Sequence, residues 1–171
     1  MYAVVFEVLP SPEGMSRYLE IAAGLRPRLE RIDGFVSVER FRCLDEPRWL
    51  LSLSFWRDEA ALMQWRMHGE HRAAQAEGRQ SVFDDYRLRV LRFGTDGGHG
   101  GRMLGLREHD GGIAAGDGRR FAGLADARRQ VDLFETGDVP GVRWGEVIRD
   151  YGMYERAQAP QSFPPVAART R

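Results

Sequence analysis

Hydrophobic residues follow two different periods along the first 93 positions of the chain. Four segments alternate or are rich in β-branched and aromatic residues, and each predicts a strand: 2–8, 35–44, 48–56 and 85–93. From Tyr18 to Ile32, apolar residues recur every three or four positions, which predicts an amphipathic helix. A second helix is predicted from Asp58 to Gln75, interrupted at Gly69. The order strand, helix, strand, strand, helix, strand is the ferredoxin-like α+β plan, an antiparallel sheet with two helices on one face.

This plan leaves the second face of the sheet without a cover. Trp49, Leu51, Leu53 and Phe55 share one side of the predicted third strand. If the helices covered one face of the sheet and water the other, large apolar side chains such as these would be exposed on the second face. The simplest cover is a second copy of the chain, packed sheet against sheet. We therefore expect a homodimer.

The pattern becomes weak after residue 93. Ten of the 25 positions from Gly94 to Gly118 are glycine, which predicts a loop, because glycine loses the most conformational freedom when it is ordered. Residues 124–135 predict a short amphipathic helix and 142–148 a further strand. We divide the chain into a ferredoxin-fold domain at 1–93, a glycine-rich insertion at 94–141, and a returning strand with an extended C-terminal tail at 142–171.

Composition narrows the function classes. All 25 basic residues are arginine, which excludes Schiff-base lysines and the lysine of a P-loop. The 25 acidic residues balance them, so no nucleic-acid partner is indicated. No apolar run is long enough to cross a membrane and the start has no basic signal region, so we expect a cytoplasmic protein. The single cysteine, Cys43, cannot form an internal disulfide.

A set of motifs in the middle of the chain carries a family resemblance. Ser54-Phe55-Trp56 ends a strand, Trp65, His68 and His71 form W-x-x-H-x-x-H on a helix, and a downstream GR…F-x-x-Y follows, at Gly78-Arg79, Phe83 and Tyr86. With MYAVVFEV and GFVSVERF, these resemble the antibiotic biosynthesis monooxygenase domain family, in its uncharacterised bacterial branch. The resemblance implies a dimeric α/β barrel with a pocket between sheet and helices in each protomer. Its characterised members either oxidise polycyclic phenols with dioxygen and no bound cofactor, or bind and degrade haem.

Haem is disfavoured by the residues at the matching positions. The resemblance implies that haem-degrading members use an Asn on the first strand, a Trp on the second helix and an axial His later in that helix. Trp65 matches the Trp, but the chain has no Asn, and Phe6 or Val8 stands in its place. The axial position falls near Gln75, so His71 would have to replace the ligand that haem iron requires. We predict no cofactor and no metal.

Three roles remain open for His68 and His71. They are three apart and would share a helix face as a metal pair if the helix were continuous, although Gly69 interrupts it. Either imidazole could instead act as a general base toward an acidic phenol, because histidine titrates near neutral pH. The third reading is structural, with both bracing the helix break. As catalytic candidates we take His71 and His68.

The predicted pocket walls are aromatic. Trp65, Phe6 and Phe83 would form a dry site for a planar substrate, and Tyr86 completes the motif. Each could equally be ordinary core. Arg40 lies on the strand face of Val36 and Val38, so it either pairs across strands at an edge or binds an anionic group in the pocket.

Together these features predict a cofactor-independent monooxygenase acting on a small aromatic or polycyclic phenol. The alternative is a non-catalytic dimer that binds a small ligand or serves in a stress response, since no complete catalytic set is present. A haem-binding or haem-degrading protein is the third reading.

Overall fold

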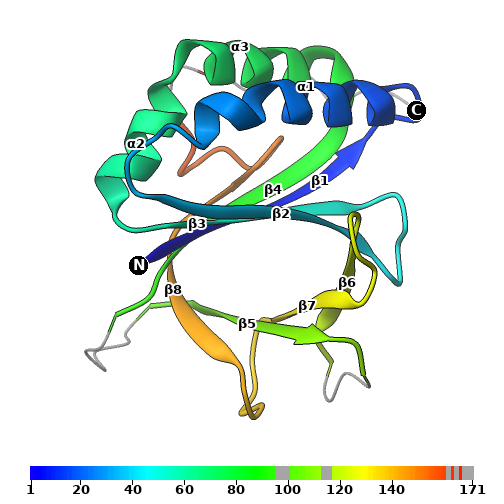
Figure 1. Cartoon of the computed structure of the whole chain (residues 1–171), viewed down its shortest axis with the longest axis vertical. Coiled ribbons are helices and arrows are strands. Elements are labelled where there is room, and N and C mark those ends of the chain that lie inside the picture. The colour runs from blue at the N-terminus through cyan, green and yellow to red at the C-terminus, as the bar shows by residue number, and fades with distance from the viewer. Residues whose placement is uncertain (95–100, 113–116, 161–162, 164–165, 167–171) are drawn as a thin grey trace.

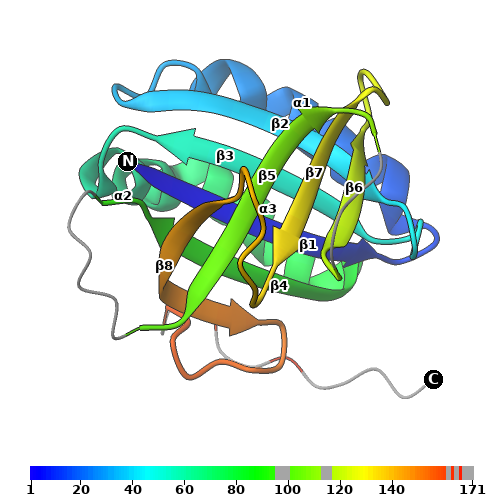
Figure 2. The ribbon, with the colours of Figure 1, turned by 90° about the horizontal axis from the view of Figure 1, so that it is seen from below.

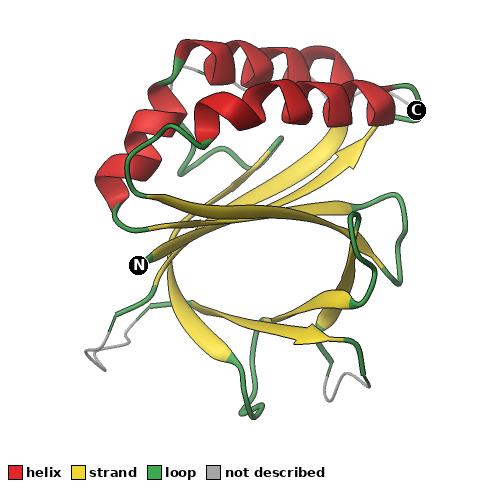
Figure 3. Ribbon diagram, viewed as in Figure 1, coloured by secondary structure: helices red, strands yellow, loops and turns green. Residues whose placement is uncertain are grey.

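The strands and helices of the first half form one antiparallel sheet with a helical layer. The computed structural model describes residues 1–94, 101–112, 117–160, 163 and 166. Strands β1 (Tyr2–Pro10), β2 (Phe35–Cys43), β3 (Leu50–Trp56) and β4 (Phe83–Arg92) lie where the alternation predicts them. Helices α1 (Gly14–Leu29), α2 (Glu59–Met67) and α3 (Gly69–Glu77) all cover the same face (Figures 1 and 3). The predicted antiparallel α+β sheet with helices on one face is confirmed.

The second predicted helix is two helices. His68 has an extended backbone, with φ −60° and ψ 129°, and it ends α2 and begins α3. Asp58 caps α2 by accepting a hydrogen bond from the amide of Ala61 at 2.9 Å. After α3 the chain continues into a five-residue π-helical turn, Gly78–Val82, which is wider than an α-helical turn and leads directly into β4.

The second half of the chain closes the sheet into a barrel. Strands β5 (Met103–Asp110), β6 (Arg119–Gly123), β7 (Arg129–Phe134) and β8 (Arg143–Gly152) complete the order β1-β3-β2-β6-β7-β5-β8-β4 (Figure 2). Each neighbouring pair is antiparallel: β6 joins β2, and β8 joins β4. The barrel is therefore continuous within one chain.

The sheet face that we expected a second copy of the chain to cover forms the interior of the barrel. Alternate residues of β1 and β3 point inward and meet apolar residues of β5, β6 and β7; this buried set comprises Ala3, Val5, Leu51, Leu53, Phe55, Leu104, Leu106, Phe121, Val131 and Leu133. The chain's own strands thus cover the sheet face that we assigned to a partner. The reasoning that led to a sheet-on-sheet dimer was wrong, because its premise, an uncovered face, does not hold. Whether two copies associate by another surface stays a prediction.

The short helix predicted at 124–135 is wrong. Residues 129–134 form β7, which pairs with β5 and β6. Val131 and Leu133 enter the barrel core while Asp132 lies between them in the strand, so period two holds where we inferred period 3.6. The strand predicted at 142–148 is confirmed within β8. The predicted loop at 94–118 contains β5, and its residues 95–100 and 113–116 lie outside the described residues, as does much of the predicted tail.

A buried ion network lies at one end of the barrel. Arg89 is 2% exposed and contacts both Glu7, which is 3% exposed, and Glu135. Arg119 also contacts Glu7 and reaches Glu46 at 2.7 Å. Glu7 thus compensates two guanidinium groups in a region where an unpaired charge would be costly.

Among the described residues, no helix has both the length and the apolar content to cross a bilayer.

Candidate functional site

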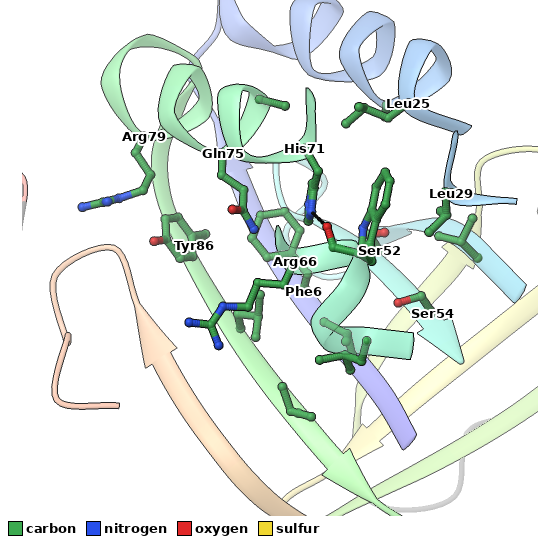
Figure 4. Close-up of a pocket in the computed structure, with 18 of the residues that line it drawn as sticks. Phe6, Leu25, Leu29, Ser52, Ser54, Arg66, His71, Gln75, Arg79 and Tyr86 are labelled. Atoms are coloured by element: carbon green, nitrogen blue, oxygen red, sulfur yellow. Dashed lines mark hydrogen bonds between the residues drawn. The ribbon is translucent and has the colours of Figure 1, made fainter. Parts of the chain in front are cut away.

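A cavity of about 210 Å³ lies between the helical layer and the sheet. Its floor is the outer face of the sheet, because alternate residues of each strand point away from the barrel: Val4 and Phe6 from β1, Ser52 and Ser54 from β3. Its roof comes from α1, α2 and α3, which contribute Leu25, Leu29 and Trp65 among others (Figure 4). The site is mainly apolar and is built mostly from the first half of the chain, with a C-terminal contribution from Arg149, Tyr151, Arg156, Pro160 and Phe163.

Six of the seven residues predicted from the sequence line this cavity: Phe6, Arg40, Trp65, His71, Phe83 and Tyr86. Three of the aromatic rings pack on one another, with centroids 5.9 Å apart for Phe6–Phe83 and 5.6 Å for Phe6–Tyr86. His68 does not line the cavity. The helix break falls on His68 itself, so the two imidazoles do not share the face that a continuous helix would give them.

His71 is held as a neutral imidazole. Its Nδ1 lies 3.0 Å from the carbonyl oxygen of Trp65, and its ring stacks on the Trp65 ring at 4.3 Å and 14°. A carbonyl can only accept, so Nδ1 carries the hydrogen and Nε2 carries the lone pair. Burial lowers the pKa of His71 from 6.5 to about 4, opposed by the Trp65 carbonyl and assisted by the charge of His68. His71 therefore presents a proton acceptor at neutral pH.

The residues present do not suggest a metal centre. Among the described residues, no three His, Cys, Asp or Glu side chains come together as ligands. His71 already uses Nδ1 in its bond to Trp65. His68 has a buried Nδ1 with no hydrogen-bond partner in the described chain, and its ring lies 5.6 Å from that of Trp65. His68 occupies the helix break through its backbone, and its side chain makes no capping hydrogen bond to α3.

Arg40 reaches the cavity floor. It lies beside Ser52 and the hydroxyl of Tyr18, whose pKa is raised by burial against the opposing influence of Arg40 and Ser52. Its Nε is buried and makes no hydrogen bond to any described residue. Of the two roles left open for Arg40, the one inside the cavity matches its position.

Sequence reasoning missed several polar residues of the cavity. Gln75 and Arg79 follow His71 at intervals of four, so all three lie along one face from α3 into the π-helical turn (Figure 4). The Oε1 atom of Gln75 is buried without a hydrogen-bond partner among the described residues. The spacing from His71 could have identified Gln75. Arg149 and Arg156 come from the distant C-terminal part and carried no comparable signal.

Comparison of the chain with known proteins agrees with this architecture. The family model described as "Antibiotic biosynthesis monooxygenase" matches residues 1–77. A protein of Pyricularia oryzae, "Jasmonate monooxygenase ABM", is 35% identical over 215 residues, which cover 98% of this chain and 100% of that protein. The chain belongs to the antibiotic biosynthesis monooxygenase family.

Two further similar proteins each match about half of this chain. "Uncharacterized protein YqjZ" of Bacillus subtilis is 33% identical over 91 residues, 53% of this chain and 77% of that protein. The solved structure of Rv0793 from Mycobacterium tuberculosis covers 56% of this chain and 97% of that chain, with 18% identity and a TM-score of 0.50. This antibiotic biosynthesis monooxygenase family member therefore has nearly half of its length outside the part that matches each of those two proteins.

Haem does not fit the cavity. Pockets for drug-sized ligands measure roughly 300–1,000 Å³, and a porphyrin is larger than such ligands, whereas this cavity measures about 210 Å³. Gln75, not a histidine, occupies the position expected for an axial ligand. We derive no step through haem.

Proposed function

We propose that the protein is a monooxygenase that oxidises a small enolisable or phenolic molecule with dioxygen and without a bound cofactor. The observation that supports it is His71, a neutral imidazole whose free Nε2 lines an aromatic cavity. Membership of the monooxygenase family makes oxygen the expected co-substrate.

The proposed reaction begins with a proton transfer. Nε2 of His71 removes the proton of an acidic C–H or O–H group, and the resulting anion donates electrons to dioxygen. For a methylene beside a carbonyl, the balance is CH₂ + O₂ → C=O + H₂O, with one oxygen atom in the product and one in water. Trp65, Phe6 and Phe83 exclude bulk water while the reactive anion exists.

The low pKa of His71 sets a requirement on this step. A base whose conjugate acid has a pKa of about 4 is weak, so it needs a substrate anion beside it to stabilise the imidazolium. Arg40 supplies further positive charge on the cavity floor for the developing oxyanion. The imidazolium of His71 and the substrate anion thus stabilise each other, and proton transfer is favoured only when substrate fills the cavity.

Cavity size favours a small substrate. At about 210 Å³ the site lies below the roughly 300–1,000 Å³ of drug-sized pockets, which argues for a single-ring compound over the polycyclic phenols that the sequence first indicated. Jasmonic acid, a cyclopentanone with an acidic methylene, is the first compound to test, because the relative of Pyricularia oryzae is described as a jasmonate monooxygenase.

The experiment is oxygen incorporation under ¹⁸O₂. Purified protein is incubated with jasmonic acid and, separately, with phenol, a single-ring phenolic compound, and the products are analysed by mass spectrometry. We expect one ¹⁸O atom per product, a loss of at least about 100-fold in rate for His71→Ala, and little change for His68→Ala, whose side chain lies outside the cavity. Equal rates for wild type and His71→Ala would refute the base role.

A second candidate function is binding without turnover. It is favoured by the weak basicity of His71. The same experiment separates the two, since a binding protein would hold the compounds and return them unlabelled.

A further inference from the structure

The cavity is positively charged on one side. Five arginines line it, Arg40, Arg66, Arg79, Arg149 and Arg156, and no Asp or Glu occurs among its described lining residues. The whole chain carries equal numbers of basic and acidic residues, so this separation is local.

Most arginines of the described residues outside the cavity are paired with a carboxylate, although Arg31, Arg42 and Arg72 are not. Arg17 bonds Glu77 at 2.6 Å, Arg57 bonds Asp33 at 2.9 Å, and Arg87 bonds Asp150 at 2.9 Å. By contrast, Arg66 and Arg149 are half-buried and form no ion pair with any carboxylate of the described residues; the nearest polar contact of Arg66 is the Sδ of Met63, at 3.8 Å. A half-buried charge at an apolar cavity is unfavourable unless a counter-charge arrives.

Tyr151 shows where these charges converge. Arg149 and Tyr151 pair with Val90 and Leu88 of β4, so they share the cavity face of the sheet. Burial raises the pKa of Tyr151, and the nearby positive charges of Arg66, Arg156 and Arg149 oppose that rise. The Tyr151 ring thus has guanidinium groups from α2, from β8 and from the segment after β8 around it.

One of these three groups is already engaged. Arg156 donates to the Tyr86 hydroxyl at 2.6 Å, to the carbonyl of Gly152 at 2.8 Å and to that of Phe163 at 2.8 Å. It therefore serves to hold the segment after β8 against β4. Arg66 and Arg149 have no carboxylate partner among the described residues; in Figure 4 the Arg66 side chain extends away from α2 toward β8.

We propose that the cavity binds an organic anion, an apolar molecule ending in a carboxylate, with the carboxylate held by Arg66 and Arg149. Guanidinium groups match carboxylates in shape and form the stronger, charge-assisted hydrogen bonds. The apolar part of the ligand then lies among Phe6, Trp65 and His71. That the ligand reacts beside His71 rests on the proposed function. The binding of the acid does not depend on it.

Binding without oxygen tests this inference separately from catalysis. Jasmonic acid, 4-phenylbutyric acid and the methyl ester of each are titrated by calorimetry under argon. We expect each acid to bind at least about tenfold more tightly than its ester, as a charged hydrogen-bond pair provides. The double variant Arg66→Gln, Arg149→Gln should remove that difference, because it should lower the affinity for the acid and leave the affinity for the ester unchanged.

Arg72→Gln is the matched control. Arg72 is an exposed arginine of α3 outside the cavity, and it has no ion pair with a described carboxylate. The control should keep the preference for the acid. A salt titration needs no variant to fold. Added salt should lower the affinity of the wild type for the acid and leave its affinity for the ester unchanged.

Each remaining outcome overturns the proposal: acids that fail to bind, esters that bind as well, or a preference that survives in the double variant. A phosphate monoester of the same chain that binds more tightly than the acid overturns the carboxylate assignment. If acids bind as expected but no ¹⁸O is incorporated, the proposed function fails and this inference stands.

Discussion

Lowering the pH from 7 to 5 should reduce the free energy of unfolding by about 2 kcal/mol through His71 alone. Burial lowers the pKa of this imidazole from 6.5 to about 4, so between those values the unfolded chain binds a proton that the folded chain does not. The stabilisation is present above pH 6.5, is lost as the pH falls through this window, and is fully lost below about pH 4. The whole difference, from 6.5 to about 4, corresponds to roughly 3 kcal/mol.

Urea denaturation of wild type and His71→Gln at pH 7 and pH 5 measures this term. Glutamine keeps a donor for the Trp65 carbonyl but cannot titrate, so the variant should lose about 2 kcal/mol less than the wild type between the two pH values. Carboxylates that titrate below pH 5 contribute equally to both proteins and cancel. Arg72→Gln, an exposed residue of the same helix outside the cavity, is the control and should show the pH dependence of the wild type. Equal pH dependence in wild type and His71→Gln would show that the burial of His71 has been misjudged.

Two further predictions concern the scaffold. Glu7→Ala should destabilise the fold by roughly 3 kcal/mol, because it leaves Arg89 buried without that partner, whereas Glu70→Ala removes only an exposed carboxylate and should cost less than about 1 kcal/mol; similar losses in urea would contradict the reasoning. Gly14→Ala should destabilise the fold by about 1–3 kcal/mol and so lower the thermal midpoint, because its methyl group would lie 2.2 Å from a backbone oxygen. In Gly24→Ala, in the same helix, the methyl group meets nothing within 4 Å, so this variant should stabilise the fold by roughly 0.5–1 kcal/mol and raise the midpoint.

Strands β1–β4 and the helical layer could be predicted from the sequence. Residues 2–8 and 48–56 have enough alternation, and Tyr18 to Ile32 enough helical period, to determine their own structure. The segment at 124–135 does not, because six residues of strand carry only two inward positions, Val131 and Leu133. Pairing with β5 and β6 decides its conformation, and such long-range pairing leaves little trace in a single sequence.

The candidate site divides in the same way. Phe6 and Tyr86 were predictable because strand alternation assigns them to a face, and Trp65 and His71 because the helical stripe does. His68, the other catalytic candidate, lies outside the cavity because the helix break falls on this residue, one position before the predicted interruption at Gly69. Arg149 reaches the cavity only because β8 pairs with β4, nearly sixty positions earlier in the chain, a contact that local pattern does not encode.

Closure of the barrel within one chain has a consequence for dilution. When two halves of a barrel belong to separate molecules, their contact is lost at low protein concentration, because association must offset the lost freedom of two bodies. Here β5–β8 are tethered to β1–β4 by the polypeptide, so their effective concentration is fixed by the linking segments. The floor of the cavity and its arginine from β8 therefore stay together however dilute the protein becomes.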